Sequence, residues 1–330
     1  MPELTVHLLD PPAGEELARL RDLLAPGVHL TCGPELPEPP CFQTLVAGRP
    51  TREQLAASPN LRYLVIPWAG LPPGTRELAR EFPALQVHNL HHNAAPTAEH
   101  GLALLFPAAK HLIPMDRVFR QHDWRPRYAP SPSILLHGKS ALILGFGAIG
   151  QRLGRYAHAL GMRVLAVRRN PDKPGPDDYP AEVYAPDALP ELLPRANVLL
   201  IALPGVPATD GLLGAAELAL LPARALLVNI GRAAVVDQAA LFAALQDGRL
   251  GGAGLDVWYH YPQDEAGRAA TPPADFPFHE LDNVVLSPHR AGGGGGEDVE
   301  ALRMQALAEL LNAAARGETP PNRVDLQAGY

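Results

Sequence analysis

The sequence is poor in cysteine, in net positive charge and in long apolar runs, and each shortage argues against a class of protein. Its 330 residues include two cysteines, Cys32 and Cys41, which are too few for a disulfide framework and lack metal-ligand spacing. Lys and Arg number 28 against 35 Asp and Glu, a formal net charge of −7, whereas nucleic-acid binding favours a basic surface that displaces phosphate counterions. No apolar run approaches the roughly 18 residues that span a bilayer. We therefore expect no metal, no nucleic-acid partner and no membrane partner.

The start of the chain lacks the basic stretch of a signal peptide and instead carries acids at Glu3 and Asp10. Together with the few cysteines, this predicts a cytoplasmic protein. Hydrophobic residues make up 47% and charged residues 19% of the chain, which is typical of globular proteins. The length suits two domains better than one.

Short apolar runs alternate with amphipathic stretches along the chain, a pattern that predicts βαβ units and parallel sheets. A proline-rich polar stretch, residues 125–132, interrupts the alternation. We therefore predict two α/β units, one formed by residues 1–109 and 293–330 and the other by residues 110–292. The expected strands are Leu4–Leu9, Val28–Thr31, Thr44–Val46, Tyr63–Ile66, Leu85–Val87, Ser140–Leu144, Arg163–Val167, Val198–Leu203, Ala225–Ile230, Ala253–Val257 and Val284–Leu286. The expected helices are Glu15–Leu24, Arg52–Ala57, Thr75–Glu81, Ala148–Leu160, Gln238–Gln246 and Glu297–Ala315.

A G-x-G-x-x-G motif directly follows one expected strand and opens the next helix, which is the context that dinucleotide binding requires. Gly145 permits a tight turn, Gly147 lets the backbone approach a pyrophosphate, and Gly150 allows close packing of helix on strand. The free N–H groups of the helix start can bind the phosphates. The motif predicts a dinucleotide site, rather than a purely structural turn, made by Gly145, Phe146, Gly147, Ala148, Ile149 and Gly150.

The residues after the next strand bear on the choice of nicotinamide cofactor. An acid there would bind the ribose 2′-hydroxyl, whereas an arginine would accept a 2′-phosphate. The chain has Arg168 and Arg169 at this place and no acid beside them. They either meet a 2′-phosphate or are two solvated surface charges. We predict NADP(H), with NAD(H) as a possible cofactor.

Four further motifs accompany the glycine motif in a fixed order: AEH at 98–100, VNIGR at 228–232, GLDVW at 254–258 and SPH at 287–289. Taken together, they resemble the D-isomer-specific 2-hydroxyacid dehydrogenase family over essentially the whole chain. The resemblance implies a Rossmann dinucleotide-binding domain inserted into a flavodoxin-like substrate domain, both with parallel sheets and with the active site in the cleft between them. It also implies a homodimer joined through the nucleotide domain and a small 2-keto or 2-hydroxy acid as substrate.

The resemblance assigns the candidate catalytic roles. His289 would exchange a proton with the substrate oxygen, for which a pKa near neutrality is suitable, and an isolated His in a structural role is the alternative. Arg232 would hold the substrate carboxylate and polarise the carbonyl with its planar fork, unless it only pairs with a nearby acid. Asp256 would face the nicotinamide or, alternatively, cap a turn. The further cofactor-binding candidates from the resemblance are Leu203, Pro204, Thr209, Ile230 and Gly231, together with Arg232, Asp256 and His289.

A loop of the first unit supplies the candidate substrate-binding residues besides Arg232. Trp68, Ala69 and Gly70 follow the expected strand at 63–66. The resemblance implies that backbone N–H groups of this loop, from Ala69 and Gly70, bind the substrate carboxylate. Trp68 could narrow the pocket or only pack against the loop.

One position departs from the family. A Glu that pairs with the catalytic His usually stands just before a proline, and here that position is Tyr261. We therefore place Tyr261 in the candidate catalytic set, while Asp264, Glu265 or Glu280 could replace the missing acid. If none does, the pKa of His289 is expected near its ordinary value of about 6.5 or below it.

Two other functions stay open at this point. The first is hydride abstraction from a small anion such as formate or phosphite, which needs no proton-relay Glu. The formate branch of the resemblance, however, has Gln rather than Tyr at the departing position. The second is a non-catalytic dinucleotide sensor, which would need neither Arg232 nor His289.

Overall fold

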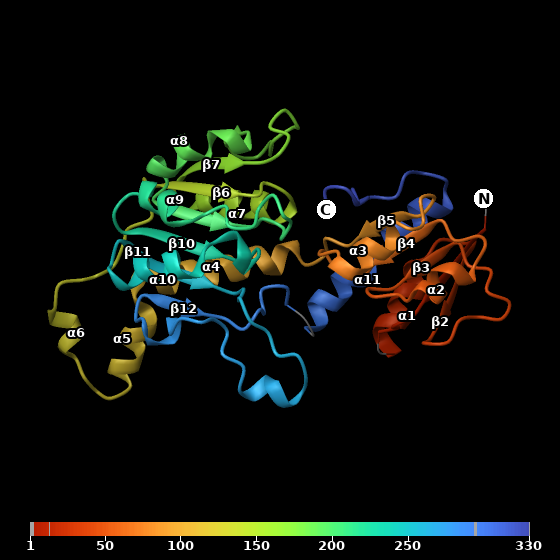
Figure 1. Cartoon of the computed structure of the whole chain (residues 1–330), viewed down its shortest axis with the longest axis horizontal. Helices are drawn as coiled ribbons and strands as arrows, with labels where there is room; N and C mark the ends of the chain where they lie inside the picture. The colour runs from red at the N-terminus through yellow and green to blue at the C-terminus, as the bar shows by residue number, and fades with distance from the viewer. Residues whose placement is uncertain (1–2, 13, 294–295, 330) are drawn as a thin grey trace. The chain divides into compact units, whose positions relative to one another are not determined.

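The computed structural model describes residues 3–12, 14–293 and 296–329 and divides the chain into two compact units (Figure 1). The first consists of Met1–Asn93 with Gly293–Tyr330, and the second of Ala94–Gly292. Within the described ranges no helix combines the length and the apolar character that crossing a membrane requires.

The first unit is built on a five-stranded parallel sheet in the order β2-β1-β3-β4-β5. Helix α11 returns from the end of the chain and packs on α1 and β2, where Leu310 and Leu311 join the buried cluster of the sheet. The strands are β1 (Leu4–Leu8), β2 (Val28–Cys32), β3 (Thr44–Val46), β4 (Tyr63–Ile66) and β5 (Gln86–Asn89). The helices are α1 (Gly14–Leu23), α2 (Arg52–Ala57), α3 (Pro73–Ala79) and α11 (Glu297–Ala315).

The second unit has a seven-stranded parallel sheet in the order β12-β11-β10-β9-β6-β7-β8. Its strands are β6 (Ser140–Leu144), β7 (Arg163–Val167), β8 (Glu182–Tyr184), β9 (Val198–Ile201), β10 (Ala225–Asn229), β11 (Leu250–Leu255) and β12 (Val284–Leu286). Its helices are α4 (Ala94–Lys110), α5 (Leu112–Phe119), α6 (Arg125–Tyr128), α7 (Ala148–Ala159), α8 (Leu189–Leu192), α9 (Ala215–Leu220) and α10 (Gln238–Gln246). Short 3₁₀ helices are η1 (Pro186–Ala188), η2 (Leu193–Arg195), η3 (Ala233–Val235), η4 (Ala266–Ala269) and η5 (Phe278–Glu280).

The order of strands reverses between β6 and β9, which makes this the topological switch point of the second sheet. In doubly wound sheets, ligands bind in the crevice outside the carboxyl ends of the strands at such a point. Helices accompany both all-parallel sheets, so the predicted α/β class with two parallel sheets is confirmed.

Several details differ from the expectation, since strand β8 and helices α5, α6, α8 and α9 are not among the expected elements and some strand bounds shift by one to three residues. Two of the differences have a clear structural reason. The second unit begins at Ala94 rather than at residue 110, because α4 packs on α7, β10 and β11. Gly254 makes this contact close, since a Cβ there would lie 2.6 Å from Cβ of Leu104. Strand β11 begins at Leu250, three residues before the expected start, because Gly252 lets the strand run close to Asn283, whose carbonyl oxygen would lie 2.8 Å from a Cβ at that position.

Candidate active site

The glycine loop at the switch point leaves room for a ligand. Gly145 has a φ of +92°, and a Cβ there would lie 2.7 Å from the carbonyl oxygen of Ala202 on the β9 loop. At Gly150 a Cβ would lie 2.0 Å from the Gly145 oxygen, so α7 starts tightly against the turn. A Cβ on Gly147 would meet no atom within 4 Å. Gly147 is the N-cap residue of α7, and no side chain caps the helix there. A cradle with free helix N–H groups fits the pyrophosphate of a dinucleotide.

The other predicted cofactor residues lie beside this loop on the carboxyl ends of β9 and β10. A Cβ on Gly231 would lie 2.6 Å from the Leu203 oxygen, so these two loops touch. The Thr209 hydroxyl bonds the Pro204 oxygen at 2.7 Å and closes the β9 loop. Phe146 and Ile230 have buried apolar side chains. Only their backbone groups are therefore available to a cofactor.

Arg168 and Arg169, which the sequence presents as a pair, have different surroundings. The Arg168 guanidinium donates to the carbonyl oxygens of Pro171 at 3.2 Å, Pro174 at 3.3 Å and Lys173. It therefore closes its own loop after β7. The side chain of Arg169 is exposed.

Arg232 follows β10 and projects from a fixed turn. The buried Asn229 accepts a hydrogen bond from the Gly231 N–H at 3.0 Å and donates to the Arg232 oxygen at 3.0 Å. The Arg232 side chain is exposed, and among the described residues it enters no ion pair. The alternative of a structural ion pair is therefore not seen, and the guanidinium can bind a carboxylate.

Asp256 holds the loop that carries His289. It follows β11 and is fully buried, and its carboxylate accepts hydrogen bonds from the Arg290 N–H at 2.8 Å, the Ala291 N–H at 2.9 Å and the Ser287 hydroxyl. These bonds hold the turn in which His289 adopts a left-handed φ of +58°. The contacts favour the turn-capping alternative for Asp256 over the expectation that it faces the nicotinamide.

His100 on α4 belongs to the same network, a role that the sequence analysis missed. Its Nε2 donates to the Ser287 hydroxyl at 2.8 Å and lies 3.5 Å from the nearer Asp256 oxygen. The AEH motif places a histidine on this helix, but only the fold shows that the imidazole reaches the β12 loop.

Tyr261 takes the place of the family Glu as the hydrogen-bond partner of His289. Its hydroxyl lies 2.8 Å from His289 Nδ1 and also accepts a hydrogen bond from the Trp258 N–H at 3.2 Å. Burial lowers the pKa of His289, the charge of Arg232 lowers it further, and Asp256 opposes the shift. Burial raises the pKa of Tyr261, against smaller opposing effects of the Trp258 N–H and Arg232. The expected direction for His289 is confirmed, and both members of the pair are neutral at pH 7.

The three acids that could have replaced the Glu are engaged elsewhere. Asp264 accepts a hydrogen bond from the Gly267 N–H at 2.7 Å. Glu265 lies 3.4 Å from Arg268, and Glu280 lies 4.0 Å from the ring of its neighbour in sequence. Among the described residues none of these acids pairs with His289.

The loop after β4 in the first unit carries the candidate substrate residues. The Trp68 indole packs on Gly48, where a Cβ would lie 1.8 Å from the ring, and the Arg49 guanidinium carbon is 5.9 Å from the ring centroid. Asn89 donates to the Ala69 oxygen at 2.5 Å. Within the described part of the chain, the N–H groups of Ala69 and Gly70 donate to no protein acceptor. They are free to bind an anion.

A doubly wound sheet with a glycine cradle at its switch point, followed on the same edge by an Arg and a His, defines a dinucleotide-binding α/β protein. Residues 102–291 match the model of the D-isomer specific 2-hydroxyacid dehydrogenase NAD-binding domain. The chain belongs to this family, and its second unit contains the NAD-binding domain.

Known proteins support the assignment along most of the chain. Identity is 34% over 237 residues with glyoxylate reductase of Korarchaeum cryptofilum, which covers 69% of this chain and 65% of that protein. Identity with glyoxylate reductase of Aeropyrum pernix is 32% over 294 residues, which covers 87% and 83%. The match to D-3-phosphoglycerate dehydrogenase of Mycobacterium tuberculosis is 30% over 283 residues, or 84% of this chain and 49% of that protein. The chain thus spans less than two thirds of some of these relatives.

Solved structures agree with the fold. The TT0316 protein of Thermus thermophilus matches with a TM-score of 0.69 and 29% identity, covering 98% of this chain and all of that one. A D-isomer specific 2-hydroxyacid dehydrogenase from Xanthobacter autotrophicus, solved with NADPH and MES, has a TM-score of 0.78 and 24% identity over the full length of both chains. At that identity, the second likeness shows the fold alone.

Proposed function

We propose that this protein is an NAD(P)-dependent oxidoreductase that interconverts a small 2-keto acid and a D-2-hydroxy acid. The observation that carries the proposal is that Arg232 and His289 lie at the same carboxyl edge of one sheet, after β10 and β12, the two strands that flank β11. The two side chains are close enough for the charge of Arg232 to lower the pKa of His289. A carboxylate on the guanidinium would bring the adjacent carbonyl to the imidazole.

Each side chain has a separate part in the reaction. Arg232 binds the carboxylate with two parallel N–H donors and polarises the neighbouring carbonyl. His289 uses Nε2 toward the substrate, because Nδ1 is bonded to Tyr261. The nicotinamide supplies or accepts the hydride when it is bound. His289 gives a proton to the substrate oxygen in reduction and takes it back in oxidation.

For the cofactor we propose NADP(H) ahead of NAD(H). Gly147 and the start of α7 would hold the pyrophosphate. Arg169 would meet the 2′-phosphate, while Arg168 shapes the loop through its own carbonyl contacts. This assigns the two arginines separate roles.

For the substrate we propose a short 2-keto acid such as glyoxylate. Two of the relatives are named glyoxylate reductases. The unpartnered N–H groups of Ala69 and Gly70 are proposed as further donors to the carboxylate, with Trp68 limiting the size of the substrate.

A panel assay tests the proposal against the two open alternatives. NADPH oxidation is followed with glyoxylate, hydroxypyruvate and pyruvate, beside NAD(P)⁺ reduction with formate and phosphite. Turnover of a 2-keto acid is the expected result. Turnover with formate or phosphite alone would establish the small-anion reaction. NADPH binding without any turnover would establish a sensor.

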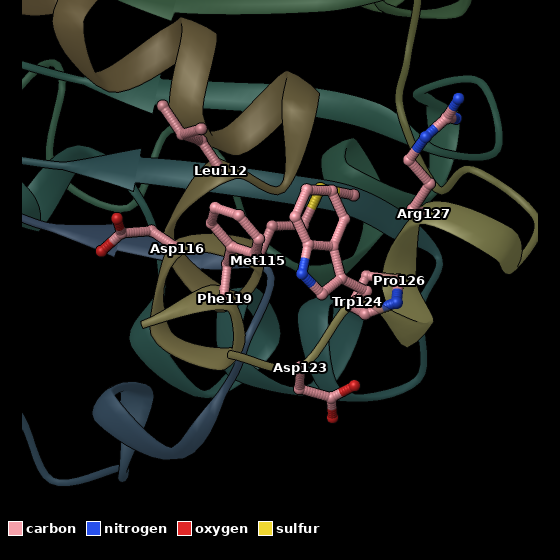
Figure 2. A pocket seen from close by; sticks show the side chains of 8 residues that line it. All are labelled: Leu112, Met115, Asp116, Phe119, Asp123, Trp124, Pro126 and Arg127. Atoms are coloured by element: carbon pink, nitrogen blue, oxygen red, sulfur yellow. The ribbon is translucent and has the colours of Figure 1, made fainter. Parts of the chain in front are cut away.

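We further propose a homodimer joined through the segment around α5 and α6. Among the described residues, seven of twelve exposed large apolar side chains lie in this region: Phe106, Leu112, Ile113, Phe119, Trp124, Tyr128 and Leu135. Figure 2 shows the rings of Phe119 and Trp124 together above Met115, and their centroids are 4.8 Å apart at 85°. Two of the neighbouring arginines are already paired with acids, as Arg120–Asp116 and Arg125–Asp123, which favours a second copy over a charged partner.

Light scattering after size-exclusion chromatography tests this surface. The wild type should be a dimer, and Trp124→Asp and Phe119→Asp should be monomers. The exposed leucine of α1 provides the matched control, since Leu23→Asp should remain dimeric. A monomeric wild type, or dimers in all variants, would contradict the proposed interface.

A further inference from the structure

The Tyr261–His289 pair differs from a carboxylate–histidine pair in one chemical respect. A carboxylate can only accept a proton from Nδ1, whereas a tyrosyl hydroxyl can either donate or accept. The Trp258 N–H already donates to the Tyr261 oxygen, and this bond leaves the hydroxyl proton for His289 Nδ1 at 2.8 Å. A neutral imidazole that accepts at Nδ1 carries its own proton on Nε2. That nitrogen has no protein partner among the described residues and is available to the substrate.

We propose that Tyr261 is the proton-relay partner of His289, and that the relay moves a proton between solvent and substrate while the imidazole remains neutral. This inference rests on the proposed function and deepens it. Tyr261, which replaces the Glu of the family, would provide a different proton path from the one that a Glu provides.

In the reducing direction, one hydride and one proton are added to the carbonyl group of the substrate. Hydride forms a C–H bond at the carbonyl carbon, and the π electron pair moves to the oxygen. That oxygen takes the proton from His289 Nε2, and Nδ1 takes the proton from the Tyr261 hydroxyl. The phenolate left behind accepts hydrogen bonds from Nδ1–H and from the Trp258 N–H. Water returns a proton to Tyr261, whose residue surface is 40% exposed. Oxidation follows the same steps in reverse.

The charged groups around the imidazole favour a neutral relay. Arg232 faces it from the β10 loop, and a second positive charge on the imidazole is unfavourable there. Asp256 lies on the β11 side but is bonded to Ser287, Arg290 and Ala291 rather than to the ring. His100 approaches from α4 and bonds the serine hydroxyl. No carboxylate in the described part of the chain accepts a proton from His289 Nδ1.

The segment that carries Tyr261 is fastened at its base. The N–H groups of Tyr259 and His260 donate to the Pro273 oxygen at 3.1 and 3.0 Å. The His260 imidazole lies 2.8 Å from Asp275, and the Tyr259 hydroxyl donates to the Val236 oxygen at 2.8 Å. These contacts fix the direction of the Tyr261 side chain.

The pH dependence of kcat/KM for glyoxylate reduction by the holoenzyme tests the relay. The wild-type value should stay within about threefold between pH 6 and 9, because imidazolium is not required. In Tyr261→Phe only imidazolium can donate, so kcat/KM should fall about tenfold per pH unit above the pKa of His289. In Tyr261→Glu the carboxylate should raise that pKa and shift the decline to higher pH. Tyr184→Phe removes a hydroxyl that bonds Glu182 on the edge strand β8 and should keep the flat profile.

Nitrogen-15 NMR of the imidazoles provides a readout without substrate or cofactor. At pH 8 the wild-type His289 should be neutral with its proton on Nε2, and Tyr261→Glu should move the proton to Nδ1. A wild-type profile that falls in parallel with Tyr261→Phe, or a wild-type proton on Nδ1, would overturn the relay. If neither the wild type nor any variant reduces a 2-keto acid, the proposed function fails. The NMR result then still decides whether the Tyr261 hydroxyl donates to His289 Nδ1 or accepts from it.

Discussion

The two parallel sheets both end in loops at the carboxyl ends of their strands, but the side chains in those loops are held differently. In the second unit Asp256 receives three hydrogen bonds from the loop of His289, and Asn229 fixes both sides of the turn before Arg232. In the first unit Trp68 rests on Gly48, and the loop is held by the bond from Asn89 to the Ala69 oxygen and by one from the Leu90 N–H to the Trp68 oxygen at 3.3 Å.

The difference matches two kinds of work. Hydride and proton transfer require reacting groups in a fixed geometry, because a displacement of about 1 Å can cost 10²-fold in rate. Binding a carboxylate through backbone N–H groups tolerates more freedom. We therefore expect variants of the second unit to change kcat and variants of the first unit to change KM or stability.

The largest effect is expected at His289. His289→Ala should reduce kcat for 2-keto acid reduction by about 10²–10⁴, the usual range for loss of a general acid. The Kd for NADPH, measured by fluorescence titration, should change much less than kcat. The exposed His279 provides the control, since His279→Ala should keep wild-type turnover. Equal turnover in both variants would remove His289 from the mechanism.

The next effect concerns stability at low pH, which we expect to fall more in the first unit than in the second. Burial lowers the pKa of His7, His88 and His92 in the first unit, and that of His92, beside Arg303, falls to about 4. Unfolded His92 binds a proton near pH 6.5 but the folded form does not until about pH 4, so stability is lost as the pH falls through this window.

At pH 4.5 the contribution of His92 to this loss is about 1–2 kcal/mol, after allowance for solvent screening of its partly exposed ring. His92→Gln should therefore reduce the fall in unfolding free energy between pH 7 and pH 4.5, measured in urea. In the wild type at pH 4.5, hydrogen exchange should be faster in the first unit than in the same unit of His92→Gln. An unchanged pH dependence in the variant would show that His92 is protonated in the folded state.

A smaller effect concerns the cofactor. A charge-assisted hydrogen bond contributes about 1.5–3 kcal/mol, so Arg169→Ala should raise the Kd for NADPH about tenfold or more. The Kd for NADH should change less than about twofold, because it has no 2′-phosphate. Tighter binding of NADH than of NADPH by the wild type would assign Arg169 to the surface.

The smallest effect is expected in the β4 loop. Trp68→Ala removes the ring that covers Gly48 and should raise KM for glyoxylate about three- to tenfold, with kcat within about twofold. Trp68→Phe retains an aromatic ring and should lie between the two. A loss confined to kcat would show that this loop takes part in the chemistry, which would contradict the division between the units.

The sequence locates the candidate site residues of the second unit better than those of the first. The glycine motif and the strand ends before Arg232, Asp256 and His289 locate this edge of the sheet, because parallel strands bring their carboxyl ends together. The short loop after β4 has no comparable pattern, and its role rests on the resemblance.

Side-chain directions could not be read from the sequence. Nothing in the order of residues shows that Arg168 is bonded to its own loop while Arg169 is exposed. The distance from His100 to Ser287 and the contact between Tyr261 and His289 each depend on how separate segments pack. The predicted start of β11 lies three residues too far along the chain because of two glycines. Glycine is generally disfavoured in strands, but Gly251 and Gly252 are required here by close neighbours.

The most direct test compares two arginines, one from each unit. Arg232→Ala should lower kcat/KM for glyoxylate about 10²-fold or more, because two charge-assisted hydrogen bonds are lost. It should leave the Kd for NADPH nearly unchanged. Arg49→Ala, which removes an exposed guanidinium beside Trp68, should lower kcat/KM less than about threefold. Equal losses in the two variants, or a larger loss in Arg49→Ala, would contradict the assignment of the chemistry to the second unit.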